Sequence, residues 1–440
     1  MIGPRPGIRP PNRQPERPAR RLGAPTTGRQ VVVFADPGDP RVDWSAAGIT
    51  DVADSRDFTA GRVPAQALRE AGATVFARLG IAVVAAPPDQ VGALRSAGPP
   101  VLSVSPELVH HVLPAEEYVR GYRDGVTDLA GRLAGAGGEE VPPPPAFADT
   151  EAATWGVQAV RATTSPYTGA GVRVAVLDTG LDLAHPDFTG RGITAESFVA
   201  GVDSAQDGHG HGTHCVGTAC GPQSPPQGPR YGVASGAEIY VGKVLSDEGS
   251  GEDGGILAGI DWAVANGCAV ISMSLGADVA EAHPPYSAAG RRALQQGSLI
   301  VAAAGNNADR ENGEYGFVGA PANSVEVLAV GAVDAALRTA WFSARSLAAP
   351  GGEVDVAGPG STSTRPGPCR SATTRSAARA WPPRTWPGWR RCGPRRPGGA
   401  ATSCGPRSPR PRAGWPSRRS TSAAGWCSRP RREPGRPEED

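Results

Sequence analysis

Three histidines stand among glycines in the stretch DGHGHGTHCVGTACG, residues 207–221. Glycine lets the backbone pack closely around His209, His211 and His214, and histidine readily takes up and releases protons near neutral pH. A His-x-His-x-x-His set could instead bind a metal ion, but no cluster of acids or cysteines completes a coordination shell. A turn with satisfied surface histidines is the third alternative. The neighbouring segments favour proton transfer.

Two further polar residues follow apolar runs that read as strands. Asp178 comes directly after residues 172–177, VRVAVL, and Asn306 follows VAAAG. Asp178 could orient and electrostatically support His211, which could then serve as general base and afterwards as general acid. Asn306 offers a side-chain N–H to a developing oxyanion. The three residues together predict a site for acyl transfer from which one member, the nucleophile, is missing.

Apolar strands and helices alternate through the region that carries these residues. Because the strands are almost wholly apolar, we expect an α/β fold with a parallel sheet that helices cover on both faces. In such sheets the active site lies at the carboxyl ends of the strands, where Asp178 is expected. The predicted strands are 172–177, 237–245, 269–276, 298–307 and 326–333, and the predicted helices are 253–267 and 288–297.

A smaller α+β domain is predicted at residues 30–114, before the α/β domain. Its expected order is β-α-β-β-α-β, which indicates a split β-α-β domain, with a generic α+β module as the alternative. The expected strands are 30–37, two within 73–86 and 101–114, with helices at 64–71 and 87–98. Residues 1–29 are rich in proline and arginine and are expected to be disordered. Residues 115–153 are expected to form a helix at 116–134 and then a proline-rich linker.

Over residues 155–360 the motifs DTGLDLAHPD, HGTHCVGT, SMSLG, VAAAGN and DVAGPG occur in an order that resembles the subtilisin-like serine proteases, or subtilases. The resemblance implies a subtilisin-like sheet and endopeptidase activity on proteins or peptides. It assigns Asp178 and His211 to a catalytic triad and makes Asn306 the oxyanion donor. It also implies that Ser274, Leu275 and Gly276 form an edge that pairs with the substrate backbone.

The same resemblance implies that residues 30–114 are a propeptide that assists folding and inhibits the active site within the same molecule. Cys215, next to the histidine motif as in the proteinase K branch, is either a reactive thiol or a small buried apolar residue. Asp182 and Asp187 could contact a structural calcium ion, although a surface loop is the default for a single pair of acids. No other cofactor or metal is expected.

The family's nucleophile motif, Gly-Thr-Ser-Met-Ala, does not occur in this chain, so no nucleophile is identifiable. Residues 361–440 contain no Leu, Ile, Val, Met, Phe or Tyr and carry 18 arginines against four acids. Such a composition cannot build a core, so the catalytic domain, 154–360, is expected to be incomplete. A nucleic-acid-binding tail is one interpretation of residues 361–440, and a shifted reading frame is the one we favour.

Codon degeneracy supports the shifted frame. Residues 378–393, ARAWPPRTWPGWRRCG, can be encoded by a string that reads Thr-Ser-Met-Ala-Thr-Pro-His-Val-Ala-Gly-Val-Ala-Ala-Leu-Trp from the third base of the first codon. That sequence is the subtilase nucleophile helix, and the break then lies at or just after Gly360. We therefore expect a serine endopeptidase precursor that is inactive as written. A non-catalytic peptide-binding pseudoprotease is the alternative.

Charge and apolar segments limit which partners and which cell compartment the sequence predicts. The net charge of +1 combines −13 before residue 361 with +14 after it. The N-terminus, MIGPRPGIRPPNRQPERPARR, has no apolar segment typical of a signal peptide, and no run of about 20 apolar residues predicts a membrane span. Neither a nucleic-acid nor a membrane partner is expected. Localisation stays open, because subtilases are often secreted.

Overall fold

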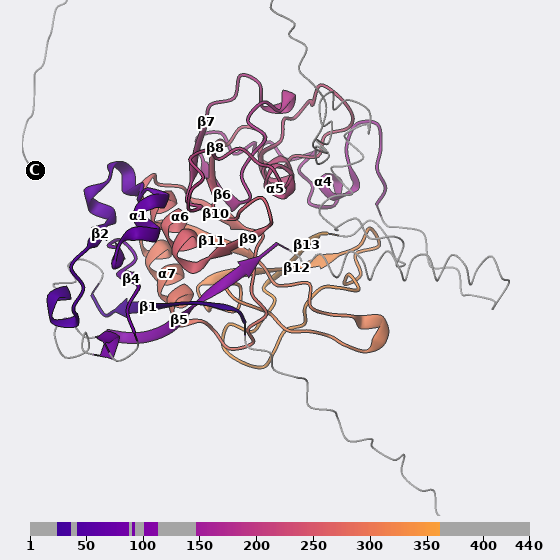
Figure 1. The fold of residues 1–440 in the computed structure, drawn as a ribbon. Coiled ribbons are helices and arrows are strands. Elements are labelled where there is room, and N and C mark those ends of the chain that lie inside the picture. Colours follow the sequence, from indigo (N-terminus) through magenta and orange to yellow (C-terminus); the bar gives the residue numbers. More distant parts are fainter. Residues whose placement is uncertain (1–23, 37–41, 88–89, 93–100, 113–146, 361–440) are drawn as a thin grey trace, which may run out of the picture. The chain divides into compact units, whose positions relative to one another are not determined.

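The computed structural model describes residues 24–36, 42–87, 90–92, 101–112 and 147–360, all within the first of two compact units, Met1–Arg384 (Figure 1). The predicted linker helix at 116–134 and the arginine-rich tail at 361–440 lie outside the described residues. No helix among those residues is both long and apolar enough to cross a bilayer.

A seven-stranded parallel sheet forms the larger part of the fold, as the apolar strand pattern predicts. Its spatial order is β13-β12-β11-β10-β6-β8-β7, and every neighbouring pair is parallel. The strands are β6 (Arg173–Asp178), β7 (Ile193–Ser197), β8 (Glu238–Lys243), β10 (Val270–Met273), β11 (Leu299–Ala303), β12 (Val327–Val333) and β13 (Val356–Pro359). The edge strands β7 and β13 were not predicted, because their residues lack an apolar run.

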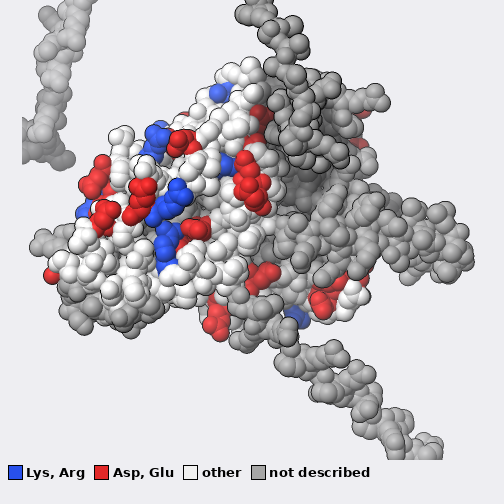
Figure 2. All heavy atoms as spheres, in the orientation of Figure 1, with Lys and Arg blue, Asp and Glu red and all other residues white. Residues whose placement is uncertain are grey.

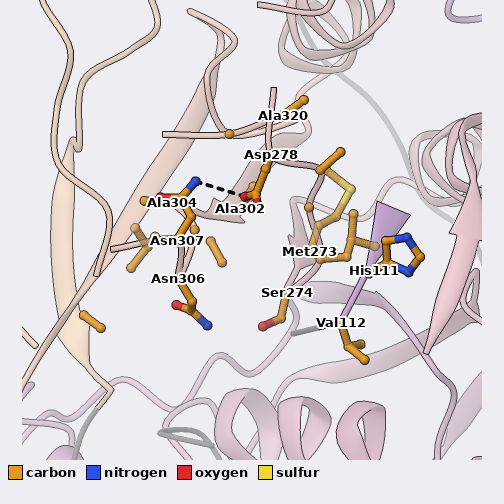
Figure 3. Close-up of a pocket in the computed structure, with 18 of the residues that line it drawn as sticks. His111, Val112, Met273, Ser274, Asp278, Ala302, Ala304, Asn306, Asn307 and Ala320 are labelled. Atoms are coloured by element: carbon orange, nitrogen blue, oxygen red, sulfur yellow. Dashed lines mark hydrogen bonds between the residues drawn. The ribbon is translucent and has the colours of Figure 1, made fainter. Parts of the chain in front are cut away.

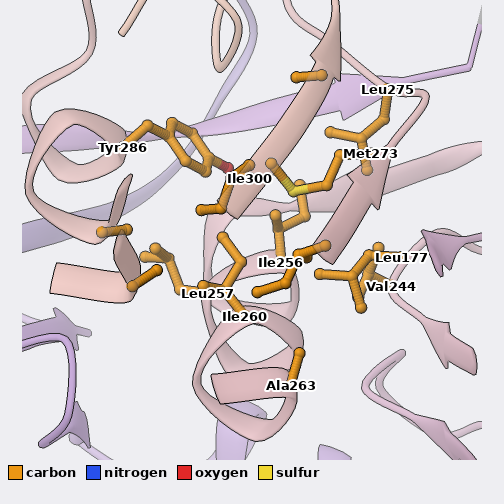
Figure 4. Close-up of a cluster of buried hydrophobic side chains, with 14 of the residues drawn as sticks. Leu177, Val244, Ile256, Leu257, Ile260, Ala263, Met273, Leu275, Tyr286 and Ile300 are labelled. Carbon is orange, nitrogen blue, oxygen red and sulfur yellow. The ribbon is translucent and has the colours of Figure 1, made fainter. Parts of the chain in front are cut away.

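Helices α6 (Asp253–Ala265) and α7 (Pro284–Gln295) cover one face of this sheet. Their apolar side chains meet those of β6, β10 and β11 in the main core, where Ile256, Ile260, Met273 and Ile300 lie together (Figure 4). Helix α7 begins four residues earlier than predicted. Prolines occupy its first turn, where a missing backbone N–H costs no hydrogen bond, and they were not recognised as a helix start.

The opposite face of the sheet is covered unevenly. Helix α5 (His211–Cys220) packs on β6 and β8. Along β10, β11 and β12 the residues toward α6 and α7 are buried, whereas the alternate residues on the α5 side, such as Val301, Ala303 and Val330, are only half-buried. Within the described ranges no helix lies over these three strands on that side. Central parallel strands are normally buried on both faces, so this face lacks a covering element there.

The smaller N-terminal domain follows the predicted β-α-β-β order over its first four predicted elements, with one unpredicted strand before the helix. Its sheet runs β2-β3-β4-β1-β5, formed by β1 (Thr26–Phe34), β2 (Val52–Asp54), β3 (Ala73–Phe76), β4 (Ile81–Val84) and β5 (Val101–His111), with α1 (Ala65–Glu70) before β3. The predicted boundary at residue 30 is wrong, since β1 starts at Thr26. The short edge strand β2 was not predicted, and the expected helix at 87–98 is described only at 90–92, which are helical.

The N-terminal sheet lies against α6 and α7 on the side away from the large sheet (Figure 1). Strand β9 (Ser250–Glu252), just before α6, extends this sheet by pairing with β5. Remaining short elements are α4 (Trp155–Ala159) and the 3-10 turns η1 (Trp44–Ala47), η2 (Ser55–Asp57), η3 (Thr59–Gly61), η4 (Pro186–Phe188) and η5 (Arg310–Asn312).

Ion pairs join the two domains around this apolar contact. Arg62 lies 2.5 Å from Glu196, Arg78 lies 3.1 Å from Asp261, and Arg29 reaches Glu252 at 2.8 Å. Acidic and basic side chains are interspersed over the face shown in Figure 2, with no continuous basic stripe there of the kind that binds nucleic acid.

Candidate active site

Asp178 and His211 form a hydrogen-bonded pair at the carboxyl end of β6. Strand β6 lies between β8 and β10, where the strand order changes direction, the usual place for a site in an open α/β sheet. The Nδ1 atom of His211 is 2.7 Å from Oδ1 of Asp178, whose side chain is 1 % exposed. The backbone N–H of Thr179 donates to the same oxygen at 2.7 Å. The structure thus brings together the two residues that the sequence assigns to proton transfer.

Close backbone packing holds these two segments together. A Cβ atom on Gly212, the second residue of α5, would collide with the backbone of Gly180, which takes a φ of +110°. The N–H of Gly212 donates to Oγ1 of Thr179 at 2.8 Å. Glycines at both positions therefore allow the loop after β6 to touch the start of α5, and this contact brings His211 to Asp178.

Asp207 is a positioning residue that sequence reasoning missed. Its Oδ1 accepts from the N–H of Gly210 at 2.8 Å and from Oγ1 of Thr179 at 2.9 Å, and its Oδ2 accepts from the N–H of Thr213 at 2.8 Å. Although burial opposes ionisation, these hydrogen bonds hold the pKa of Asp207 below its usual value. The sequence did contain a signal for this role, because an acid just before a loop and a helix start can accept hydrogen bonds from the N–H groups there.

The environment sets different pKa values for the histidines. Burial alone would lower the pKa of His211, but the charge of Asp178 and the bond between them outweigh it and raise the pKa well above 6.5. Burial lowers the pKa of His214 to about 4, and neither ring nitrogen of His214 has a partner among the described residues. Of these two histidines, His211 is therefore the one equipped as the acid-base group.

The described residues do not support a metal site built from three histidines. The one group of potential ligands found among them is Asp178, His211 and Cys215, whose ligand atoms lie within 4.8 Å of one another. Burial raises the pKa of the Cys215 thiol, which lies 3.8 Å from Nδ1 of His211. A half-buried thiol that stays protonated is a poor nucleophile, which favours the apolar alternative for Cys215.

The two acids considered for calcium are engaged within the protein. Tyr231 donates its hydroxyl to Oδ2 of Asp187, and Oδ1 of Asp182 accepts from the N–H of Ala184 at 3.2 Å. Both carboxylates therefore already accept hydrogen bonds from the protein itself.

Asn306 projects into a cavity of about 530 Å³ that His211 also lines (Figure 3). Gly305 takes a φ of +121°, a conformation strained for other residues, as the chain leaves β11. The neighbouring Asn307 uses its amide on Asp278, at 2.9 Å, and on Phe317. No side-chain hydrogen bond of Asn306 is found within the described ranges. Its amide is therefore available to a ligand in the cavity.

Ser274, Leu275 and Gly276, which the resemblance assigns to a substrate-binding edge, follow β10 and line the same cavity. Gly276 exchanges two backbone hydrogen bonds with His111, of 3.0 and 3.2 Å. The edge is thus already paired, in antiparallel fashion, with the end of β5. His111 and Val112 lie across the cavity from Asn306 in Figure 3.

No hydroxyl group of the described residues hydrogen-bonds to Nε2 of His211, the ring nitrogen that points away from Asp178. The cavity lining contains Ser272 and Ser274, and the structure gives neither of them a contact with His211. An Asp–His pair at the switch strand of a parallel sheet, beside an edge that pairs with an extended peptide, defines the site of a hydrolase of the serine-protease class.

Comparison with known proteins agrees with this class. The family model described as the subtilase family matches residues 169–382. Subtilisin Savinase of Lederbergia lenta is 40% identical over 215 residues, which are 47% of this chain and 75% of that protein. An alkaline protease of Alkalihalobacillus alcalophilus is 40% identical over 215 residues, and the match spans about half, 53%, of its length. A cold-adapted subtilisin-like serine proteinase is 32% identical, with a TM-score of 0.37 over 45% of this chain and 66% of that chain.

The chain belongs to the subtilase family. Its fold is α/β, and serine-type proteolysis is the function of the family.

Proposed function

We propose that this chain is a serine endopeptidase precursor whose N-terminal domain is an intramolecular propeptide. The observation that carries the proposal is the end of β5 in the substrate groove. His111 pairs with Gly276 on one side, and the N–H of Val112 donates to the carbonyl of Gly249 at 2.8 Å on the other. An extended segment paired on both sides occupies the groove as a peptide substrate would.

Each site residue has a role in peptide hydrolysis. In the complete enzyme a serine hydroxyl gives its proton to Nε2 of His211 as its oxygen attacks the scissile carbonyl. Asp178 holds the resulting imidazolium, and Asn306 donates an N–H to the oxyanion. His211 then protonates the leaving amine, which departs as the acyl-enzyme forms. Water repeats the sequence, with His211 as base, and releases the acid and the free serine.

The second part of the proposal is that the serine is missing because the reading frame shifts at or just after Gly360. The half-buried face of β10, β11 and β12 supports it, because a helix is needed there to bury Val301, Val330 and their neighbours. The adjoining cavity reaches Gly360, the last described residue. The codons of 378–393 can encode such a helix, with the serine at its start. As written, the chain is inactive.

The alternative function is peptide binding without catalysis. The backbone edge at Gly276 favours it, since that edge needs no serine to pair with a strand. However, β5 already holds this edge, so a partner peptide would have to displace part of the chain itself. Saturable binding of extended peptides by the chain as written, without cleavage, would support this alternative.

The experiment that tests the frame shift is to sequence the gene across the codons of residues 355–392 from an independent preparation. We expect one inserted or deleted base near the codon of Gly360, after which the frame reads Gly-Thr-Ser-Met-Ala. If the second sequence is identical, the frame shift is not a sequencing error. The gene then encodes a chain without a nucleophile.

A further inference from the structure

We propose that the side chains of Asp253, His283 and Tyr286, which surround the buried His110, form a pocket of the substrate groove that selects a histidine side chain in the bound peptide. This inference rests on the proposed function, because it takes the groove occupied by β5 to be the substrate groove. It adds a substrate class to that function and assigns Asp253 as a specificity-determining residue.

The pocket receives the side chain of His110, which points from the end of β5 into the catalytic domain. We call this end of β5 the groove segment. His110 lies opposite Gly251 of β9, one residue before the residue that pairs with Gly276. Side chains alternate along a strand, so His111 is exposed whereas His110 is fully buried at 0 % exposure. A peptide bound in the same register would place its residue opposite Gly251 in this pocket.

The residues of the pocket come from the starts of α6 and α7. Nε2 of His110 lies 2.8 Å from Oδ1 of Asp253, the first residue of α6. Tyr286 of α7 donates its hydroxyl to the same oxygen at 2.7 Å, and its ring meets the imidazole edge-to-face with a centroid distance of 5.3 Å. His283, before α7, lies 3.1 Å from Oδ2 of Asp253.

Asp253 accepts four hydrogen bonds, and two of them come from the groove segment. These two are the ring N–H of His110 and the backbone N–H of Leu108, which is 2.7 Å from Oδ2. A carboxylate has about four acceptor positions, so the occupied groove satisfies Asp253 completely. Without the segment, Asp253 keeps the bonds from His283 and Tyr286, and its two other acceptor positions open to the groove. The empty groove therefore favours a peptide whose side chain brings a donor to this position.

Burial and hydrogen bonding indicate a side chain with one N–H donor for Asp253 and a flat ring. A leucine would fill the space but leave an acceptor position of Asp253 empty, which costs more than a hydrogen bond normally contributes. A lysine would bring three N–H donors, whereas His110 makes one bond to Asp253 here, so N–H groups of a buried ammonium would be left without an acceptor. Histidine supplies one donor, an apolar ring edge and a partner for Tyr286.

The first test uses the full chain, with its own segment as the ligand. Hydrogen exchange of the His111 and Val112 amides reports how long the segment stays in the groove. We expect H110A and H110L to speed exchange by about 10- to 100-fold, because each variant loses one hydrogen bond to a charged acceptor. H111A, which removes the exposed neighbouring ring, is the matched control and should change it by less than about threefold. Protection in H110L equal to that of the unchanged chain would overturn the proposal.

The second test measures selection directly. Fluorescein-labelled copies of residues 106–112, with His, Leu or Lys at the position of His110, are titrated into full-length H110A and followed by fluorescence anisotropy. If H110A is unfolded by circular dichroism, H110L takes its place. We expect the His peptide to bind at least about tenfold more tightly than the Leu and Lys peptides. Equal affinities, or no binding of the His peptide, would overturn the subsite.

Neither measurement needs a nucleophile, so the two proposals fail separately. Loss of selectivity here refutes only the histidine subsite. An inactive chain with its frame restored refutes only the catalytic function.

Discussion

His211 depends on one carboxylate for its basicity, and that dependence can be measured without a nucleophile. The charge of Asp178 raises the pKa of His211 against the effect of burial. We expect D178N to lower this pKa by at least about one unit, because an amide offers no opposing charge. An NMR titration of the histidine ring protons in the full chain measures it, with H209A identifying the neighbouring signal. An unchanged pKa of His211 would contradict the role of Asp178 as its charge partner.

In the frame-restored enzyme the same substitution should lower kcat by about 10³- to 10⁴-fold, since the imidazole loses both its orientation and its counter-charge. Hydrolysis of a peptide substrate measures the loss. Full activity of D178N would contradict the role assigned to Asp178.

The loop before His211 depends on Asp207 in a way that stability measurements can detect. D207A removes the acceptor for the N–H groups of Gly210 and Thr213 at the start of α5, and we expect it to lower the free energy of unfolding by about 1–2 kcal/mol. Urea denaturation measures the change. D203A, an exposed acid in the same loop, is the control. Equal stability of the two variants would contradict this account of Asp207.

At the residue scale the sequence was informative where a reactive group follows an apolar run. Asp178 and Asn306 could be predicted because strand ends in a parallel sheet converge on one edge, and His211 could be predicted from its glycine-histidine motif. Asp207 was missed because its partners are backbone N–H groups of a loop, whose geometry no composition reveals. The His110–Asp253 contact was also missed, since its partners are 143 residues apart in the chain and lie in different domains.

At the scale of elements, helix α6 carries a buried acid whose titration links stability to pH. Burial raises the pKa of Asp261 to about 6, and Arg78 of the N-terminal domain offsets only part of the effect. A raised pKa means that the folded chain binds the proton more tightly than the unfolded chain does. Stability from this group is therefore full below about pH 4 and is lost as the pH rises through about 6.

D261N removes this titration while keeping a polar side chain next to Arg78. Relative to the unchanged chain, we expect D261N to gain up to about 3 kcal/mol of unfolding free energy between pH 4.5 and pH 8. Urea denaturation at the two pH values measures it. A difference between the two chains that stays the same at both pH values would contradict the assignment.

The elements that could be predicted are those with long apolar patterns, such as β6, β11, α6 and the strand order of the small domain. The short strands β2, β7, β9 and β13 could not be predicted. Strand β9, with the sequence SGE, is a strand only because β5 lies beside it, so its conformation depends on tertiary pairing and not on its own residues.

At the scale of the whole molecule, the described residues combine a complete Asp–His pair, a substrate edge filled by the chain's own N-terminal domain, and a sheet face without its cover. The proposed subtilase precursor with a shifted reading frame would account for all three. Apolar residues of β11 and β12 are half-buried among the described residues, so under the proposed frame shift the chain as written should aggregate more readily than a frame-restored chain. Light scattering at matched concentrations measures this, and equal scattering would count against the missing helix.

The most direct test of the central claim compares the chain as written with one whose frame is restored by a single base near the codon of Gly360. Both are treated with a fluorophosphonate probe, whose phosphorus is attacked by an activated serine as fluoride leaves, and H211A of the restored chain is the control. The account predicts labelling of the restored chain alone. Labelling of the chain as written, or a folded restored chain that takes up no label, would contradict it.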